Sequence, residues 1–221
     1  MKIVFDKEKH LYLVDSEPYP SVTQIISQTV PIPFQVAAWW GYKAAASGEN
    51  PSQKRQSAAL IGTRVHEAFA EMVVGNPVDD FDYEDLEGFL VAIEAFIEEN
   101  QPAFCITEHQ VASKRYRYAG TLDLVCMFHA GEYAGRYALV DVKTGRMYPD
   151  QHWPQLAAYK EAFREMRYGY GDDPVAYPPF ILDLKATGKY RLIPVTDTFN
   201  DFKVLLDHYN SIQERKRRKK K

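Results

Sequence analysis

Two carboxylates stand inside apolar segments that otherwise have the pattern of buried strands. Asp123 lies within TLDLVCMF, and Asp141 lies within YALVDVK, where Lys143 follows two residues later. Because side chains alternate between the two faces of a strand, Asp141 and Lys143 must point to the same face. If the two strands are neighbours, one end of the sheet gathers two carboxylates and an ammonium group. This combination is suited to a divalent cation and a phosphate.

An Asp-x-Lys pair alone is weak evidence, because the chain contains three of them. The pair at 201 and 203 lies in a segment with a helical pattern, where residues two apart do not face each other. Asp183 and Lys185 precede the turn residues ATG, which predicts a solvated strand end. Only the pair at 141 follows a strand with an embedded acid and precedes Gln155 and Tyr159, which a helix would place on one face.

Four short motifs resemble, in the same order, those of a known enzyme superfamily. They are Gly62-Thr-Arg-Val-His66, Gly120-Thr-Leu-Asp123, Asp141-Val-Lys143 and Gln155-x-x-x-Tyr159. Together they look like the PD-(D/E)XK nuclease superfamily, in particular its branch of RecB-type nuclease domains and of phage and mitochondrial exonucleases. The segment SVTQII, which begins at Ser21, also resembles the entry segment of the stand-alone members. The resemblance covers most of the chain.

The resemblance implies a divalent-metal site. Asp123, Asp141 and the backbone carbonyl of Val142 would supply the oxygen ligands that Mg²⁺ prefers. His66 would be a further ligand, and its imidazole favours Mn²⁺ as well, although a lone histidine on a half-apolar helix is otherwise typical of a core residue. RecB-type domains carry an additional acid on the preceding strand, and Glu108 stands at that point, where a polar strand face is the alternative interpretation.

The remaining motif residues would serve the reaction and the substrate. Phosphodiester hydrolysis needs an attacking water, which Lys143 would orient or deprotonate. The resemblance implies that Gln155 and Tyr159 position the scissile strand or brace the lysine and its water. Four residues near the motifs are candidate DNA contacts, with ordinary packing or exposure as the alternative for each: Arg64, Arg146, Tyr148 and Trp153.

The order of elements predicts an α/β fold. We expect a restriction-endonuclease-like core, with a central mixed sheet of an antiparallel meander plus a crossover strand, flanked by helices and preceded by an N-terminal hairpin and helical extension. The expected strands cover residues 2–14 (as a hairpin), 104–113, 116–128, 136–144, 179–184 and 190–194. The expected helices begin after a capping box at Ser21 and Gln24 and then cover 34–46, 53–74, 83–99, 150–167 and 198–214.

The expected domain organisation is a single nuclease domain over residues 1–214, with 1–52 as the extension and 53–214 as the core. Residues 215–221 are seven consecutive basic side chains, so residues 1–214 carry 20 basic and 30 acidic side chains, a net charge of −10. Such a run predicts a disordered tail, which either keeps the chain soluble or contacts phosphates without sequence preference.

Three local features have competing interpretations. Trp39 and Trp40 lie within an expected helix, where packing is favoured over base stacking. Gly62 inside a helix costs about 1 kcal/mol relative to alanine, so another backbone or a ligand is expected to approach there. Cys105 and Cys126 are interpreted as free, buried thiols, and two cysteines exclude an iron–sulfur cluster bound by four.

Composition sets the class of protein. A hydrophobic content of 46% with 26% charged residues is ordinary for a globular protein. No apolar run is long enough to cross a bilayer and no signal-peptide pattern opens the chain, so we expect no membrane and a cytoplasmic location, that of the host for a phage protein. No phosphate-binding loop of the GxxxxGK[ST] type occurs, so a helicase or recombination partner would be a separate protein.

These features predict a metal-dependent exonuclease that acts on DNA ends or single strands, with Mg²⁺ or Mn²⁺ as cofactor. A structure-specific endonuclease of the same superfamily is the alternative within the enzymes. A non-catalytic DNA-binding module on the same fold is the alternative from another class. The intact set of Asp123, Asp141 and Lys143 argues against the module, since an inactive copy is expected to lose one of these residues first.

Overall fold

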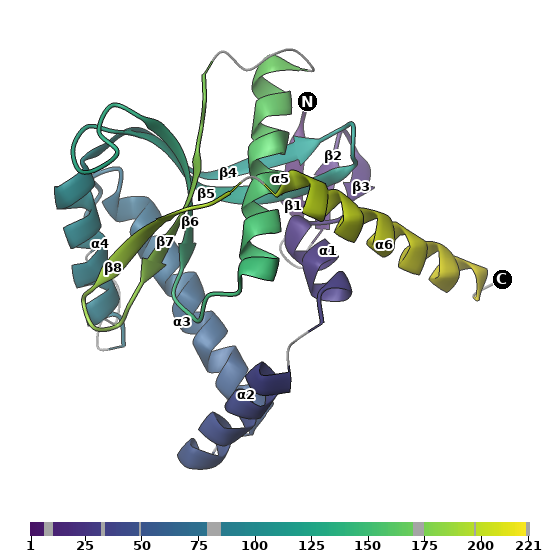
Figure 1. Cartoon of the computed structure of the whole chain (residues 1–221), viewed down its shortest axis with the longest axis horizontal. Helices are drawn as coiled ribbons and strands as arrows, with labels where there is room; N and C mark the ends of the chain where they lie inside the picture. The colour runs from purple at the N-terminus through teal and green to yellow at the C-terminus, as the bar shows by residue number, and fades with distance from the viewer. Residues whose placement is uncertain are drawn as a thin grey trace.

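A mixed five-stranded sheet forms the centre of the computed structural model (Figure 1). The structure describes all residues except 7–10, 32–33, 49, 79–84, 170–174, 197 and 220–221. The strands follow one another across the sheet in chain order: β4 (Pro102–Ser113), β5 (Tyr118–Phe128), β6 (Tyr137–Lys143), β7 (Pro179–Leu184) and β8 (Tyr190–Pro194). Neighbouring strands are antiparallel except β6 and β7, which are parallel. The predicted meander and crossover strand are confirmed.

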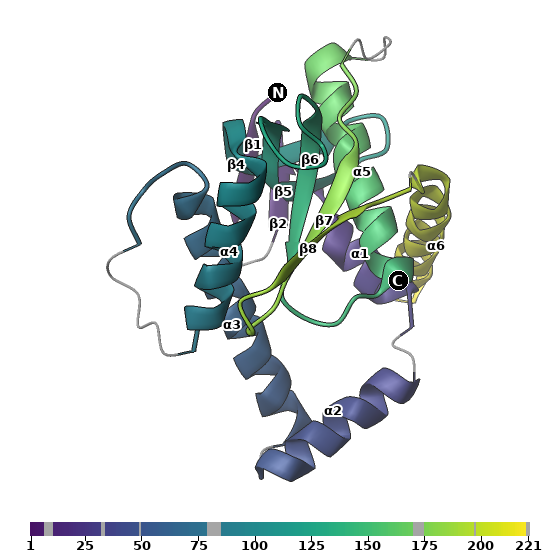
Figure 2. The same ribbon diagram turned by 60° about the vertical axis from the view of Figure 1, so that its left-hand side comes forward.

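Helices cover both faces of this sheet, as Figure 2 shows. α1 (Val22–Thr29), α5 (Pro149–Tyr168) and α6 (Phe199–Arg218) share one apolar cluster with β5, β6 and β7. α3 (Pro51–Met72) and α4 (Glu87–Asn100) share the other. Along β6 the side chains alternate between the two clusters, since Leu139 belongs to the first while its neighbour Val140 belongs to the second.

The crossover helix α5 links the two parallel strands. Parallel neighbours need a long connection, and this one leaves β6 at Lys143 and returns at Pro179. Pro149 occupies the first turn of α5, where its missing N–H does no harm, and Gly169 ends the helix at a φ of 65°. The first turns of α5 therefore lie beside the end of β6 that carries Asp141 and Lys143.

A small second sheet packs against β4 and β5. The predicted hairpin is confirmed as β1 (Ile3–Asp6) and β2 (Leu11–Val14), whose connecting residues lie outside the described part of the chain. A third strand, β3 (Glu17–Tyr19), was not predicted because Pro18 and Pro20 favour a break. β3 is an edge strand, where a proline is tolerated because its missing donor faces away from the ladder.

The helix boundaries follow local capping chemistry. The Ser21 hydroxyl accepts a hydrogen bond from the Gln24 N–H at 3.0 Å, so the predicted start of α1 is confirmed. α3 begins at Pro51 behind an Asn50–Gln53 capping box. The helix predicted over 83–99 begins at Glu87, since residues 85 and 86 form a turn, and 83 and 84 lie outside the described residues.

α2 (Phe34–Ser47) lies against the first half of α3, away from the sheet (Figures 1 and 2). We call residues 34–64 the helical arm. The residues that α3 buries, Val65, Ala68 and Phe69, all lie beyond the arm. Trp39 is 38% exposed on the arm, so the packing predicted for it is only partial. The Trp40 ring lies edge-on to the Trp39 ring, at a centroid distance of 4.9 Å.

The basic C-terminal end of the chain differs from the prediction. α6 continues through Arg215 to Arg218, so the predicted disorder of the basic tail is wrong for these residues, while Lys220 and Lys221 lie outside the described part. Cys105 and Cys126 are free, as predicted, but only Cys126 is buried, and Cys105 is half-buried. Among the described residues, no helix combines the length and the apolarity that crossing a membrane requires.

Candidate active site

Three carboxylates lie in one row across adjacent strands. In the register of β4 with β5, Thr107 pairs with Leu124 and His109 with Leu122, which sets Glu108 opposite Asp123. In the register of β5 with β6, Leu124 pairs with Val140, and one further step sets Asp123 opposite Asp141. The Val142 N–H donates a hydrogen bond to Asp123 Oδ2 at 2.7 Å, which fixes this carboxylate between the strands. The predicted neighbourhood of the two aspartates is thus present.

Lys143 completes the charged group on β6. Its Nζ lies 2.5 Å from Asp141 Oδ2, so the two side chains share a face as predicted. Burial alone would lower the pKa of Lys143, but the negative charges of Asp141 and Asp123 raise it above its ordinary value. Burial also raises the pKa of Asp141, against the opposing effect of the ammonium group. Lys143 is therefore a charged donor, which suits orienting a water or a phosphoryl oxygen better than removing a proton.

His66 projects from α3 to this row and not into hydrocarbon. Its Nδ1 lies 3.2 Å from Asp123 Oδ1, and its side chain keeps 29% of its surface exposed. Burial would lower the pKa of His66, but the Asp123 carboxylate more than compensates, and the pKa lies above its ordinary value. The same contact lowers the pKa of Asp123 in spite of its burial. Asp123 is consequently more readily ionised than Asp141.

One group of potential metal ligands lies here within the described part of the chain. His66, Glu108 and Asp123 each offer a ligand atom, and these atoms all lie within 4.8 Å of one another. Glu108 is exposed and adopts a left-handed φ of 48°, which interrupts the regular alternation of β4 at this residue. Asp141 is not a member of this closest group, because Lys143 and α5 hold its oxygens. The role of the Val142 carbonyl as a ligand stays a prediction.

α5 holds Asp141 from the other side. Gln155 Nε2 donates to Asp141 Oδ1 at 3.3 Å and to the Tyr159 hydroxyl at 3.2 Å. The Tyr159 ring lies against Gly120, where an added Cβ would come within 2.4 Å of Cε1. The glycine of the Gly120-x-x-Asp123 segment thus makes room for the ring whose hydroxyl positions Gln155. Gln155 therefore contacts Asp141 directly, and Tyr159 acts on Asp141 through Gln155.

The N-terminal sheet supports the same region. The Tyr12 hydroxyl and Thr121 Oγ1 are hydrogen-bonded at 2.8 Å, which ties β2 to β5 between Gly120 and Asp123. The negative charge of Glu108 contributes to the raised pKa of Tyr12, although burial is the larger cause. This contact could not be predicted, because the two residues are 109 positions apart in the chain and Tyr12 belongs to no motif.

The four candidate DNA contacts have different surroundings. Arg146 is exposed in the loop between β6 and α5. Tyr148 caps α5, and its ring meets the His152 ring at a centroid distance of 5.9 Å. Trp153 is half-buried against the apolar cluster of α5, so packing describes it better than a DNA contact. Arg64 is half-buried on α3, two residues before His66 and therefore on a different side of the helix.

No known protein family provides a model that matches this chain, and no curated protein matches it.

Asp183 is a buried acid beside the site whose surroundings the sequence did not predict. Its side chain is fully buried, so the predicted solvated strand end is wrong. Its two oxygens lie 2.6 Å from Lys185 Nζ and 2.5 Å from an Arg191 nitrogen. Lys185 also donates to the Gly145 carbonyl at 3.3 Å, which ties down the loop that carries Arg146. The apolar run FIL before Asp183 was the available signal for burial.

Replacing Asp183 with asparagine is expected to destabilise the fold. Asp183→Asn removes the negative charge that two cations share, and breaking a buried pair costs about 3 kcal/mol. Lys185 and Arg191 are 38% and 64% exposed and can turn toward water, which reduces the expected loss to about 2 kcal/mol. Urea unfolding would measure it, with the exposed Asp207→Asn on α6 as the control. Equal midpoints for the two variants would contradict this account of Asp183.

The surroundings of Gly62 leave room for a methyl group, although the sequence predicted a close approach of another backbone or a ligand there. An added Cβ would lie 3.5 Å from Thr144 Oγ1, which is ordinary van der Waals contact. Gly62→Ala should therefore fit without strain and raise the free energy of unfolding by up to about 1 kcal/mol through helix propensity. Thermal or urea unfolding would measure the gain. A destabilised variant would mean that the close approach expected from the sequence does exist.

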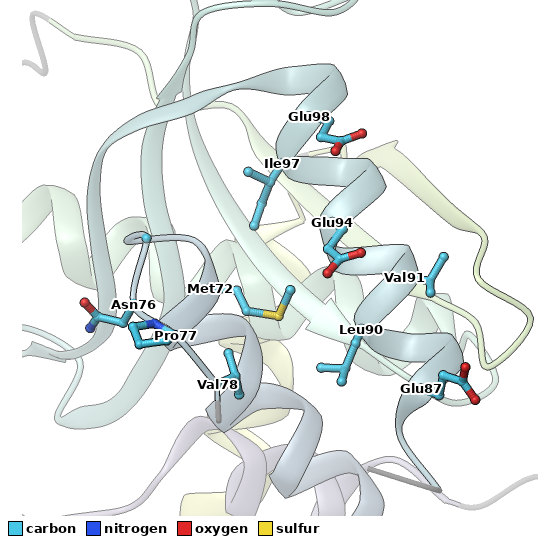
Figure 3. A pocket seen from close by; sticks show the side chains of 11 residues that line it. Met72, Asn76, Pro77, Val78, Glu87, Leu90, Val91, Glu94, Ile97 and Glu98 are labelled. Atoms are coloured by element: carbon cyan, nitrogen blue, oxygen red, sulfur yellow. The ribbon is translucent and has the colours of Figure 1, made fainter. Parts of the chain in front are cut away.

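A separate groove lies between the end of α3 and α4 (Figure 3). Its floor is apolar, and acidic side chains of α4 line it. The floor includes Met72, Leu90, Val91 and Ile97, and the acids are Glu87, Glu94 and Glu98. Because these acids would repel a polyanion, the groove is a poor site for nucleic acid. None of its residues belongs to the candidate active site.

Proposed function

We propose that this chain is a divalent-metal-dependent DNA nuclease of the PD-(D/E)XK superfamily, which hydrolyses phosphodiester bonds at DNA ends or in single strands. The observation that carries the proposal is the row of Glu108, Asp123 and Asp141, with Lys143 and His66 in contact with it. A cluster of acids held beside a charged lysine combines ligands for a cation with a donor for a phosphate.

The order of elements supports the same assignment. A helix, three antiparallel strands, a crossover helix and a parallel strand form the core expected of this superfamily, and α4, β4, β5, β6, α5 and β7 follow that order. The acids belong to β4, β5 and β6, at the end of the sheet where α5 begins. A restriction-endonuclease-like core is therefore the fold that we propose for the sheet and its helices.

The residues present fit Mg²⁺ or Mn²⁺. Asp123, Glu108 and His66 would hold the ion, with Asp141 at the next position of the row. Carboxylate oxygens suit both ions, and the imidazole favours Mn²⁺. When bound, such an ion would offset negative charge on the phosphoryl group and make a water more acidic.

The other residues of the site would orient the attacking water, hold the Asp141 carboxylate and contact the substrate. Lys143 donates to the attacking water or to a phosphoryl oxygen, as its raised pKa favours. Gln155 fixes the Asp141 carboxylate, and Tyr159 fixes Gln155. Arg146 is exposed in the loop beside them and can contact a backbone phosphate of the substrate. His66 and Asp123 orient each other through their 3.2 Å contact.

A cleavage assay tests the proposal. The protein would be incubated with end-labelled linear DNA, covalently closed circular DNA and single-stranded DNA, in Mg²⁺, Mn²⁺ or EDTA. We expect metal-dependent digestion of linear and single-stranded DNA, no loss of circles, and no digestion in EDTA. Cutting of closed circles would favour the structure-specific endonuclease instead. Binding of DNA without cleavage under any condition would contradict the proposal and favour a non-catalytic module.

A further inference from the structure

Two aromatic side chains and a lysine form an exposed patch on α2. Trp39 is 38% exposed and Tyr42 is 72% exposed. Residues three and four apart lie on one side of a helix, so Trp39, Tyr42 and Lys43 face the same way. Lys43 Nζ lies 5.6 Å from the centre of the Trp39 ring. Of the buried side chains of α2, Ala44 lies on another side, whereas Val36 precedes Trp39 by three residues and borders the patch.

The helical arm differs in charge from the rest of the protein. Residues 34–64 contain four basic side chains and one acidic side chain, a net charge of +3. The other residues of 1–214 contain 16 basic and 29 acidic side chains, a net charge of −13. A positive arm on an acidic body attracts a polyanion, as does the basic end of α6.

The arm leads directly to the candidate active site. α3 carries both the end of the arm and His66, and α2 lies against the first half of α3 (Figures 1 and 2). α3 begins at Pro51, 15 residues before His66, which is about 22 Å along the axis at a rise of about 1.5 Å per residue. A strand bound on α2 would therefore run along the first half of α3 to reach the row of acids.

We propose that the patch of Trp39, Tyr42 and Lys43 binds an unpaired strand of DNA, with bases stacked on the two rings and the backbone beside the ammonium group. This inference rests on the proposed function, since it assigns the substrate strand of the same site. Aromatic rings stack with any base, and each stacked base contributes a sizeable share of the affinity. Only unpaired bases can stack in this way, so the patch selects frayed ends and single strands over intact duplex.

Binding can be measured without cleavage. Fluorescence anisotropy of a labelled oligothymidylate of about 20 nucleotides, in EDTA at fixed salt, would report the affinity of the full chain. We expect Trp39→Ala combined with Tyr42→Ala to weaken binding by about 10-fold or more. Trp39→Phe combined with Tyr42→Phe keeps both rings and should retain most of the affinity. Phe104→Ala removes a ring that is 73% exposed on β4, outside the arm, and should change nothing.

Three results would overturn the inference. The first is an unchanged affinity after both rings are removed. The second is equal binding of the single strand and of a blunt duplex of the same length. The third is a wild-type dimer, seen by light scattering, that the alanine variant converts to monomer, because a second copy would then cover the patch. Loss of metal-dependent cleavage with ring-dependent binding intact would contradict the proposed nuclease and leave this inference standing.

Discussion

Lys143→Ala should slow DNA cleavage strongly and leave the fold intact. Lys143 is in contact with Asp141, and its side chain is 18% exposed at the surface of the site. Its loss removes the donor for the attacking water or the phosphoryl oxygen, and removing one such donor typically slows a reaction about 100- to 1,000-fold. Single-turnover cleavage of linear DNA at saturating metal would measure the effect.

The chain supplies a matched control for this substitution. Lys203 also follows an aspartate by two residues, but it lies on α6, outside the site. Lys203→Ala should cleave DNA at the wild-type rate. Both variants should have the circular dichroism spectrum of the wild type. If Lys143→Ala cleaves as fast as Lys203→Ala, the lysine has no part in the reaction.

Gly120→Ala is expected to damage both stability and activity. The new Cβ would lie 2.4 Å from Tyr159 Cε1, so the ring must move. Overpacking of this kind costs about 1–3 kcal/mol. Movement of Tyr159 also disturbs Gln155 and, through it, the Asp141 carboxylate, and a misplacement of about 1 Å lowers a rate about 100-fold. Urea unfolding and the cleavage rate of the same preparation would measure the two effects.

A second glycine controls for the change in backbone freedom. An added Cβ at Gly41 on α2 would meet nothing within 4 Å, so Gly41→Ala should be neutral or slightly stabilising. Gly120→Ala combined with Tyr159→Leu removes the ring atom that the methyl group meets, and should recover part of the stability but not the activity. A stable and active Gly120→Ala single variant would show that the ring has room to move.

The central elements could be predicted because their signals are local. β5 and β6 each have an apolar pattern broken by one acid, and the row of carboxylates follows once the strands pair at that level. The start of α1 could be predicted from Ser21 and Gln24, which are neighbours in the sequence and interact in the structure. These features need no knowledge of distant parts of the chain.

The features that were missed depend on distant contacts. Asp183 is buried because Arg191 and Lys185 neutralise it across a hairpin, which a strand pattern does not reveal. Trp39 is exposed because α2 packs mainly on α3, and the sequence pattern of α2 does not reveal which side this contact covers. The contact of Gly120 with Tyr159 joins residues 39 positions apart, and only the packing of α5 on β5 brings them together.

Titration with Mn²⁺ is the most direct test of the candidate site. Electron paramagnetic resonance would measure free Mn²⁺ with the wild type, Asp123→Asn, Lys143→Ala and the distant control Asp207→Asn. We expect saturable binding by the wild type, Lys143→Ala and Asp207→Asn, and its loss in Asp123→Asn, because an amide oxygen is a weaker ligand than a carboxylate. Equal binding by the wild type and Asp123→Asn would contradict the assignment of the metal site.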